Sequence, residues 1–262
     1  MGSSRNLTLY VDLLSQPCRA VTIFCSGMID DDDDDDEDAR VNEIEADVQI
    51  VSLWKKETRE PPFLAINPLG QVPAIDDGGF TLSESHTIMR YLAATRTVAD
   101  HWYPEDLEKR ACVDRVLDWQ FGNLHRDVAQ FLVHRELAPL LGRTKNPTLA
   151  AEAEDSLKQS LKTMETVWLK DSPFLAGGSQ PSIADISSAC QLQQLKVLDK
   201  EEPGALLAPY EKVKAWMVAV EDFTAPYFVD AHGVLEKVAK IFEDRRKSEA
   251  EAEAEVETAP KL

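Results

Sequence analysis

Long apolar runs are missing from this sequence, which argues against a protein with membrane-spanning helices. No stretch approaches the roughly 18–20 consecutive apolar residues that a helix needs to span a bilayer. The opening residues, MGSSRNLTLY, contain no apolar segment of the kind found in a secretory signal. We therefore expect a cytoplasmic protein. The closing residues Pro260, Lys261 and Leu262 are similar to the Ser-Lys-Leu peroxisomal address, so the peroxisome is the alternative location.

Paired cysteines are also missing. The four cysteines are Cys18, Cys25, Cys112 and Cys190, and no two of them form a C-x-x-C motif. Widely separated cysteines are typical of free thiols in a reducing compartment, whereas a disulfide framework or a zinc site needs closely spaced ones. We therefore expect free thiols and no metal site.

The chain has no excess of basic residues. Lys and Arg number 28 against 47 Asp and Glu, and the net charge of −19 argues against binding to nucleic acid or to an anionic membrane. Residues 30–38 are nine consecutive acidic residues. Because like charges at this density repel, we expect a disordered insert at about 30–42. Calcium binding by this run is the alternative, although it lacks the spaced ligands and the glycine of a known calcium loop.

The sequence does contain enough apolar residues, 44% of 262, for a sizeable core. Leu7, Leu9, Val11 and Leu13 alternate with other residues, which is the period of a strand with one buried face. Pro17 then favours the first turn of a helix, where its missing N–H is not needed. Ser15 is therefore predicted at the point where a strand ends and a helix begins.

This position of Ser15 has two interpretations. The free N–H groups and the positive dipole end of a helix favour an anion there, and a serine hydroxyl can donate a hydrogen bond to a bound thiolate. Such a bond favours the charged form of the thiol and lowers its pKa. The alternative is that Ser15 is only the N-cap of the helix.

The next part of the chain continues the mixed pattern. Residues 48–53 are a second strand candidate, 76–79 (DDGG) are a hairpin signal, and 80–82 are the returning strand. A proline inside a short strand pattern, such as Pro73, must lie at an edge, a bulge or a cis turn. Residues 83–92 predict a helix. The expected order is strand, helix, strand, loop, strand, strand, helix.

From Trp102 onward the apolar spacing becomes helical. Residues spaced by three or four predict successive helices through Val113, Leu117, Phe121, Leu124, Val128 and Phe131, through Leu157, Leu161, Met164 and Trp168, through Tyr210, Val213, Met217 and Val220, and through Val234, Val238 and Ile241. Residues 182–185 (SIAD) resemble a capping box that begins a further helix. We therefore expect a mixed domain at residues 1–93, an all-helical domain at 102–245 and an acidic disordered tail at 246–262.

Four motifs in this order resemble the glutathione transferases, most closely the theta class. They are LYVDLLSQPCRAV, INPLGQVPAIDDGGFTLSESHTIMRYL, YPEDLEKRACVDRVLDWQ and SIADI. The resemblance covers about Leu7 to His232 and omits the acidic insert and tail. It implies an α/β thioredoxin-like N-terminal domain (βαβ-ββα) and an all-α C-terminal helical bundle.

The resemblance also implies roles for individual residues. Ser15 would hold the sulfur of glutathione as a thiolate, acting as a hydrogen-bond donor and not as a covalent nucleophile. Val72, followed by a cis Pro73, would offer its backbone to the cysteinyl part of glutathione. Gln71 would line the same site.

The γ-glutamyl end of glutathione would bind where the helix at 83–92 begins. The resemblance gives the Glu84 carboxylate to the ammonium group, and the hydroxyl and backbone N–H of Ser85 to the carboxylate. The alternative is that both residues are only helix N-terminal residues.

The sequence departs from the family at the glycyl end of glutathione. Theta enzymes often carry a basic residue there, and the ungapped match in this chain is Thr58. Arg59 follows it directly, and Lys55 and Lys56 precede it, so any of these three cations is a candidate for the glycyl carboxylate.

A second-substrate pocket is expected on the long helix of the helical domain, with Trp119, His125 and Arg126 as its candidate residues. Asp185 is expected to be a structural cap and not a catalytic residue. Cys18 lies where a thioredoxin-like redox site has its second cysteine, but Ser15 occupies the first place, so we expect Cys18 to be packed and inert.

The resemblance implies a glutathione transferase that conjugates glutathione to small hydrophobic electrophiles such as organic halides and epoxides, or reduces organic hydroperoxides. Glutathione would be the co-substrate, no metal is expected, and the partner would be a second copy of the chain in a homodimer. The alternatives are a non-catalytic glutathione or ligand carrier and an interaction scaffold on the same fold.

Overall fold

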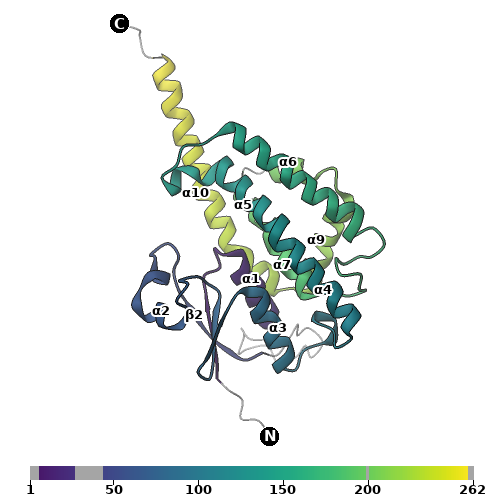
Figure 1. The fold of residues 1–262 in the computed structure, drawn as a ribbon. Coiled ribbons are helices and arrows are strands. Elements are labelled where there is room, and N and C mark those ends of the chain that lie inside the picture. Colours follow the sequence, from purple (N-terminus) through teal and green to yellow (C-terminus); the bar gives the residue numbers. More distant parts are fainter. Residues whose placement is uncertain (1–5, 27–43, 199–200, 259–262) are drawn as a thin grey trace.

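The computed structural model describes residues 6–26, 44–198 and 201–258 (Figure 1). The acidic insert predicted at 30–42 and the terminal residues 260–262 lie outside this part of the chain, so the predictions made for them stay predictions.

The N-terminal domain is built on one four-stranded sheet. Its strands are β1 (Leu7–Val11), β2 (Ala46–Ile50), β3 (Ala74–Asp77) and β4 (Phe80–Ser83). They lie in the order β2-β1-β3-β4; β1 and β2 are parallel, and β3 is antiparallel to both β1 and β4. Leu7, Leu9 and Val11 are buried, as the alternation predicted, but β1 ends at Val11, so Leu13 lies beyond the strand and is only partly buried.

Three helices complete this domain: α1 (Gln16–Cys25), α2 (Pro61–Ile66) and α3 (Ser85–Thr95). The order matches the prediction except for α2, which the sequence analysis left in a loop. This helix has only six residues, begins with prolines and buries only Phe63, so it has no apolar period to detect.

The second domain is all-helical. Its α-helices are α4 (Leu107–Gln120), α5 (Arg126–Leu132), α6 (Pro147–Thr163), α7 (Ile183–Gln193), α8 (Glu202–Leu207), α9 (Glu211–Phe223) and α10 (Tyr227–Thr258). The chain also has short 3₁₀ segments at η1 (Glu57–Arg59), η2 (Asp100–Trp102), η5 (Ala138–Leu141) and η7 (Gln194–Val197), and π-helical turns at η3 (Phe121–His125), η4 (Val133–Leu137) and η6 (Met164–Trp168). Among the described helices, none combines the length and the apolar character that crossing a bilayer would require.

Helix α7 lies at the centre of the molecule, and every one of its residues is buried. Helix α1 packs against it, so a continuous apolar core joins the sheet to the helical domain (Figure 1). The capping box predicted at the start of α7 is present, with Ser182 and Asp185 as its two members. Helix α1 therefore packs against elements of both domains.

Two sequence expectations differ from the structure in the helical domain. Phe121 was placed on the buried face of the long helix, but it is 61% exposed. It begins the π-helical turn η3, which adds a residue to the turn and changes the face that later residues present. Ile241 is also exposed, because α10 buries Phe228, Leu235 and Phe242 instead.

The acidic tail also differs from expectation. A disordered segment was predicted from residue 246, but α10 continues to Thr258 and extends away from the rest of the molecule (Figure 1). Alanine and glutamate alternate in this stretch, and both have high helix propensity. This propensity favours a helix even though the stretch has no apolar face. Lys247 and Glu243 form an i,i+4 ion pair of 2.7 Å on the same helix.

Candidate active site

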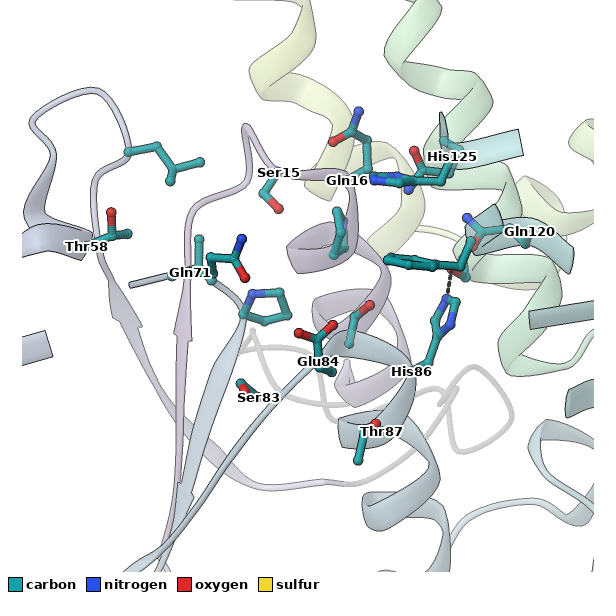
Figure 2. Close-up of a pocket in the computed structure, with 18 of the residues that line it drawn as sticks. Ser15, Gln16, Thr58, Gln71, Ser83, Glu84, His86, Thr87, Gln120 and His125 are labelled. Carbon is teal, nitrogen blue, oxygen red and sulfur yellow. Dashed lines mark hydrogen bonds between the residues drawn. The ribbon is translucent and has the colours of Figure 1, made fainter. Parts of the chain in front are cut away.

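A cavity of ≈ 740 Å³ lies where the ends of the N-terminal strands meet the helical domain (Figure 2). Its lining residues from the first domain are Ser15, Gln16, Pro17, Leu53, Thr58, Arg59, Gly70, Gln71, Val72, Pro73, Ser83, Glu84, Ser85, His86, Thr87 and Arg90. Those from the second domain are Asp118, Gln120, Phe121, His125, Ser187 and Gln191. Of the residues predicted for glutathione, the cavity therefore brings together Ser15, Thr58, Arg59, Gln71, Val72, Glu84 and Ser85.

Ser15 is the N-cap residue of α1 and has extended backbone angles, with φ −84° and ψ 124°. Its hydroxyl makes no capping hydrogen bond to the helix, so it does not serve as the side-chain cap that was the alternative interpretation. Its carbonyl accepts the Arg19 N–H at 3.1 Å, which begins the helix. The hydroxyl thus lines the cavity at the positive end of a helix dipole.

Asp12 holds the Ser15 turn in place, a role that the sequence analysis missed. Its carboxylate accepts the N–H of Leu14 at 2.9 Å and that of Leu53 at 2.8 Å, and its carbonyl accepts the Ser15 N–H at 2.9 Å. Asp12 is buried, with 8% of its surface exposed. The strand alternation gave no reason to single it out.

The cysteinyl side of the cavity is formed by the segment that leads into β3. The Val72–Pro73 peptide bond is cis, as the resemblance implied. Before it, the side chain of Asn67 donates to the carbonyl of Gln71 at 2.7 Å. This bond fixes the backbone just before Val72, which lines the cavity.

Another part of the cavity lining is formed by the start of α3. Glu84 is the N-cap residue and has φ 72° and ψ 110°, a conformation that L residues rarely adopt. Its carbonyl accepts the Ile88 N–H at 2.8 Å. Backbone strain at such a residue persists where the surrounding structure holds it, commonly at a ligand site. Ser85 follows as the first residue of the helix.

Thr58 and Arg59 lie on a third side of the cavity. Thr58 is buried, whereas Arg59 is exposed and its guanidinium donates to the Leu69 carbonyl at 3.4 Å. Gly70 permits this approach: its φ is +62°, and a Cβ there would lie 2.8 Å from the Arg59 Nη1. Lys55 does not line the cavity and instead pairs with Glu57 at 3.9 Å. Of the candidate cations, the structure brings Arg59 to the cavity.

The predicted second-substrate residues are only partly correct. His125 lines the cavity, and its ring stacks on Phe121 with centroids 5.6 Å apart. Trp119 does not line it, because its ring packs toward Trp168 at 5.6 Å. Arg126 does not line it either, because it is exposed and pairs with Asp127 at 2.8 Å.

The residues that take their place were missed. Gln120 and Phe121 line the cavity from the long helix, one and two positions beyond Trp119. From the other domain His86 shares a hydrogen bond of 2.8 Å with the Ser187 hydroxyl (Figure 2). Burial lowers the pKa of His86 to about 4, and the nearby positive charge of Arg90 acts in the same direction. His86 is therefore neutral near pH 7, and no short motif connects it to a residue of α7.

Cys18 and Asp185 have the structural roles that were expected. Cys18 is fully buried, and burial raises the pKa of its thiol to about 12, which leaves it protonated and unreactive. Asp185 is also fully buried and does not line the cavity. Its carboxylate accepts hydrogen bonds from Leu175, Ser182 and Trp216. Within the described residues, no three histidine, cysteine or carboxylate side chains gather in a way that would hold a metal ion.

The fold defines a class of two-domain proteins with a thioredoxin-like domain followed by an all-helical domain, and the cavity between the two is the candidate active site. Residues 39–94 match the family profile "Glutathione S-transferase, N-terminal domain", and residues 137–219 match "Glutathione S-transferase, C-terminal domain". The chain belongs to the glutathione S-transferase family, within its theta class. It is therefore a transferase with glutathione as its co-substrate.

Individual relatives are similar over almost the whole chain. Glutathione S-transferase T1 of Arabidopsis thaliana is 46% identical over 242 residues, which are 92% of this chain and 93% of the relative. Human glutathione transferase theta-2, solved in complex with glutathione and an unknown ligand, has a TM-score of 0.80 at 31% identity, covering 92% and 91% of the two chains. A human theta-class structure with the glutathione conjugate of 1-menaphthyl sulfate has a TM-score of 0.79 at 31% identity and the same coverage.

Proposed function

We propose that this chain binds glutathione in the cavity beside Ser15, holds its sulfur as a thiolate, and transfers it to small hydrophobic electrophiles. Organic halides and epoxides are the expected acceptors, and organic hydroperoxides are the expected substrates of a reductive side reaction. The observation that carries the proposal is the Ser15 hydroxyl, which lines the cavity at the start of α1 without capping the helix.

Three other parts of the cavity support a single orientation of glutathione. The backbone of Val72 is available to the cysteinyl part, and Glu84 with Ser85 is available to the γ-glutamyl end. Arg59 is the cation that lines the cavity beside Thr58, so it is our candidate for the glycyl carboxylate. In this orientation the sulfur would face Ser15, with Gln120, Phe121 and His125 around the electrophile.

The chemistry needed from Ser15 is modest. A free thiol has a pKa of about 8.5, so only about 3% of it is ionised at pH 7. A hydrogen bond and a helix dipole that lower this pKa by about two units, or roughly 2.7 kcal/mol, raise the ionised fraction to about 75%. The thiolate then forms a bond to the electrophilic carbon while the halide leaves or the epoxide C–O bond breaks. Holding both reactants in one cavity supplies the rest of the rate enhancement.

Ultraviolet difference spectra of bound glutathione across pH test this proposal. The wild-type protein is expected to show the thiolate band well below the pKa of the free thiol, and Ser15→Ala is expected to lose it. Ser156→Ala is the matched control, because its hydroxyl is exposed on α6 and donates to the Glu152 carbonyl at 3.0 Å. A full thiolate band in Ser15→Ala would contradict the role of Ser15. Glutathione bound by wild type without a thiolate band would instead support the carrier alternative.

We also propose a two-fold homodimer in a reducing compartment, the cytoplasm or the peroxisome. The four cysteines are all free, which is consistent with reducing conditions. Sedimentation would show twice the mass of the chain for a dimer and a single chain mass if the proposal is wrong. A fluorescent fusion to the N-terminus, compared with one lacking the last three residues, would distinguish the two locations.

A further inference from the structure

Arg19 has an unusual environment for an arginine. It lies in the first turns of α1, four residues after Ser15, and none of its surface is exposed. A positive side chain near the amino-terminal end of a helix is unfavourable, because the helix dipole is positive there. Burying a charge adds a further cost. These two costs indicate that the guanidinium makes interactions that an apolar side chain at this position could not make.

The guanidinium joins the Ser15 turn to the helical domain. One nitrogen, Nη1, donates to the carbonyl of Leu13 at 2.7 Å and to that of Leu14 at 3.3 Å. The other, Nη2, donates to the carbonyl of Cys190 at 3.2 Å and to the side-chain oxygen of Gln194 at 2.6 Å. Leu13 and Leu14 directly precede Ser15, so these bonds hold the turn against α7 and η7.

All four acceptors of Arg19 are neutral oxygens. None of the ion pairs formed among the described residues includes Arg19, so no carboxylate there neutralises its charge by direct contact. Its effect reaches neighbouring groups. Burial lowers the pKa of His232 to about 3, and the charge of Arg19 adds to this shift. The same charge favours the ionised form of the Cys18 thiol, which lies in the turn after Ser15, although burial and the nearby Asp12 carboxylate both raise the pKa of that thiol.

We propose that Arg19 is a positioning residue for Ser15 and that its buried, unneutralised charge stabilises the glutathione thiolate. It acts from beneath the turn, through the carbonyls of Leu13 and Leu14 and through its electric field, and it does not touch the substrate. This inference rests on the proposed role of Ser15, since it needs the sulfur to lie at that turn. A positive charge buried near a thiolate site favours ionisation, because little water is present to screen it.

Gln194→Glu is the sharpest test, because it places a carboxylate on the guanidinium while leaving Arg19 unchanged. The 2.6 Å contact becomes an ion pair, so the anchoring is kept and the charge is neutralised. We expect the apparent pKa of bound glutathione to rise by about one unit. The ratio kcat/KM would then fall about tenfold at pH values below the wild-type pKa and remain unchanged on the alkaline plateau. A purely structural role for Arg19 would lower activity equally at every pH or leave it unchanged.

Two substitutions of Arg19 separate its charge from its hydrogen bonds. Arg19→Gln keeps a donor for the turn but removes the charge, so it is expected to raise the pKa of the bound thiol as Gln194→Glu does. Arg19→Lys keeps the charge and is expected to change that pKa by less than about half a unit. Gln130→Glu adds the same negative charge at an exposed position on α5 and is the matched control.

The outcomes distinguish this inference from the role of Ser15. If Ser15→Ala loses the thiolate band while Gln194→Glu and Arg19→Gln keep the wild-type pH profile, Arg19 has no electrostatic role and the inference is wrong. If wild type itself shows no thiolate band, the proposed function fails first. If Arg19→Gln does not fold, the pH profile of Gln194→Glu alone tests the inference, because this variant keeps the hydrogen bond between positions 19 and 194.

Discussion

Replacement of Glu84 by glycine is predicted to stabilise the protein and to weaken its binding of glutathione. Glu84 has φ 72° and ψ 110°, which costs a non-glycine residue about 1–3 kcal/mol. Glycine adopts this conformation without strain, but it loses about 0.5–1 kcal/mol more backbone entropy on folding. No hydrogen bond or ion pair of the Glu84 side chain is found among the described residues, and the residue is exposed, so little else is lost.

The net effect of Glu84→Gly is a gain of about 1 kcal/mol in the free energy of unfolding. For a chain of this size, that corresponds to a rise in Tm of about 2–4 °C. Binding changes in the opposite direction. A charge-assisted hydrogen bond to the ammonium group of glutathione contributes about 1.5–3 kcal/mol, so the Kd is expected to increase roughly ten- to hundredfold.

Thermal unfolding without ligand and calorimetric titration with glutathione measure the two effects. Glu84→Ala is the control, because it removes the carboxylate but keeps the Cβ and therefore the strain. It is expected to weaken binding without raising Tm. A Glu84→Gly variant that melts below wild type would refute the strain argument, and one that binds glutathione as tightly as wild type would refute the role of the carboxylate.

Two further predictions concern stability. Asp185→Ala removes a carboxylate that accepts four hydrogen bonds in a fully buried site. At about 1 kcal/mol for each bond, the free energy of unfolding measured by urea titration should fall by about 4 kcal/mol. A loss below about 1 kcal/mol would contradict this account. Burial lowers the pKa of His86 from 6.5 to about 4 in the folded protein. Between pH 6.5 and 4 the unfolded chain therefore binds a proton on His86 more readily than the folded protein does, so stability is lost as the pH falls through this range. Wild type should lose up to about 3 kcal/mol relative to His86→Gln over this range, whereas parallel pH profiles of the two proteins would rule out a buried neutral His86.

The sequence predicted the parts of the site that depend on short-range patterns. Alternating Leu7, Leu9 and Val11 followed by Pro17 located the Ser15 turn, because strand period and proline position are local signals. The same holds for the start of α3 at Ser85. The glutathione side of the cavity could therefore be predicted, helped by motifs that follow one another along the chain.

The helical side of the cavity could not be predicted in the same way. A regular 3.6-residue period was assumed for the long helix, and η3 breaks it. Phe121 therefore lines the cavity, whereas Trp119 packs toward Trp168. His86 and Ser187 meet only after the two domains pack, so their pairing has no signature in either segment alone. Helix α2 was missed because it is too short to show a period.

The hydrogen bond between His86 and Ser187 and the one that Arg19 donates to Gln194 both cross from one domain to the other. Each pair has one member per domain, so the two domains are not interchangeable modules. A chimera that joined this N-terminal domain to the helical domain of a relative would separate both pairs unless the donor carried matching residues at positions 187 and 194. Exchange of a whole domain between relatives therefore requires that both members of each pair be kept. The two pairs limit which relatives can donate a helical domain to this chain.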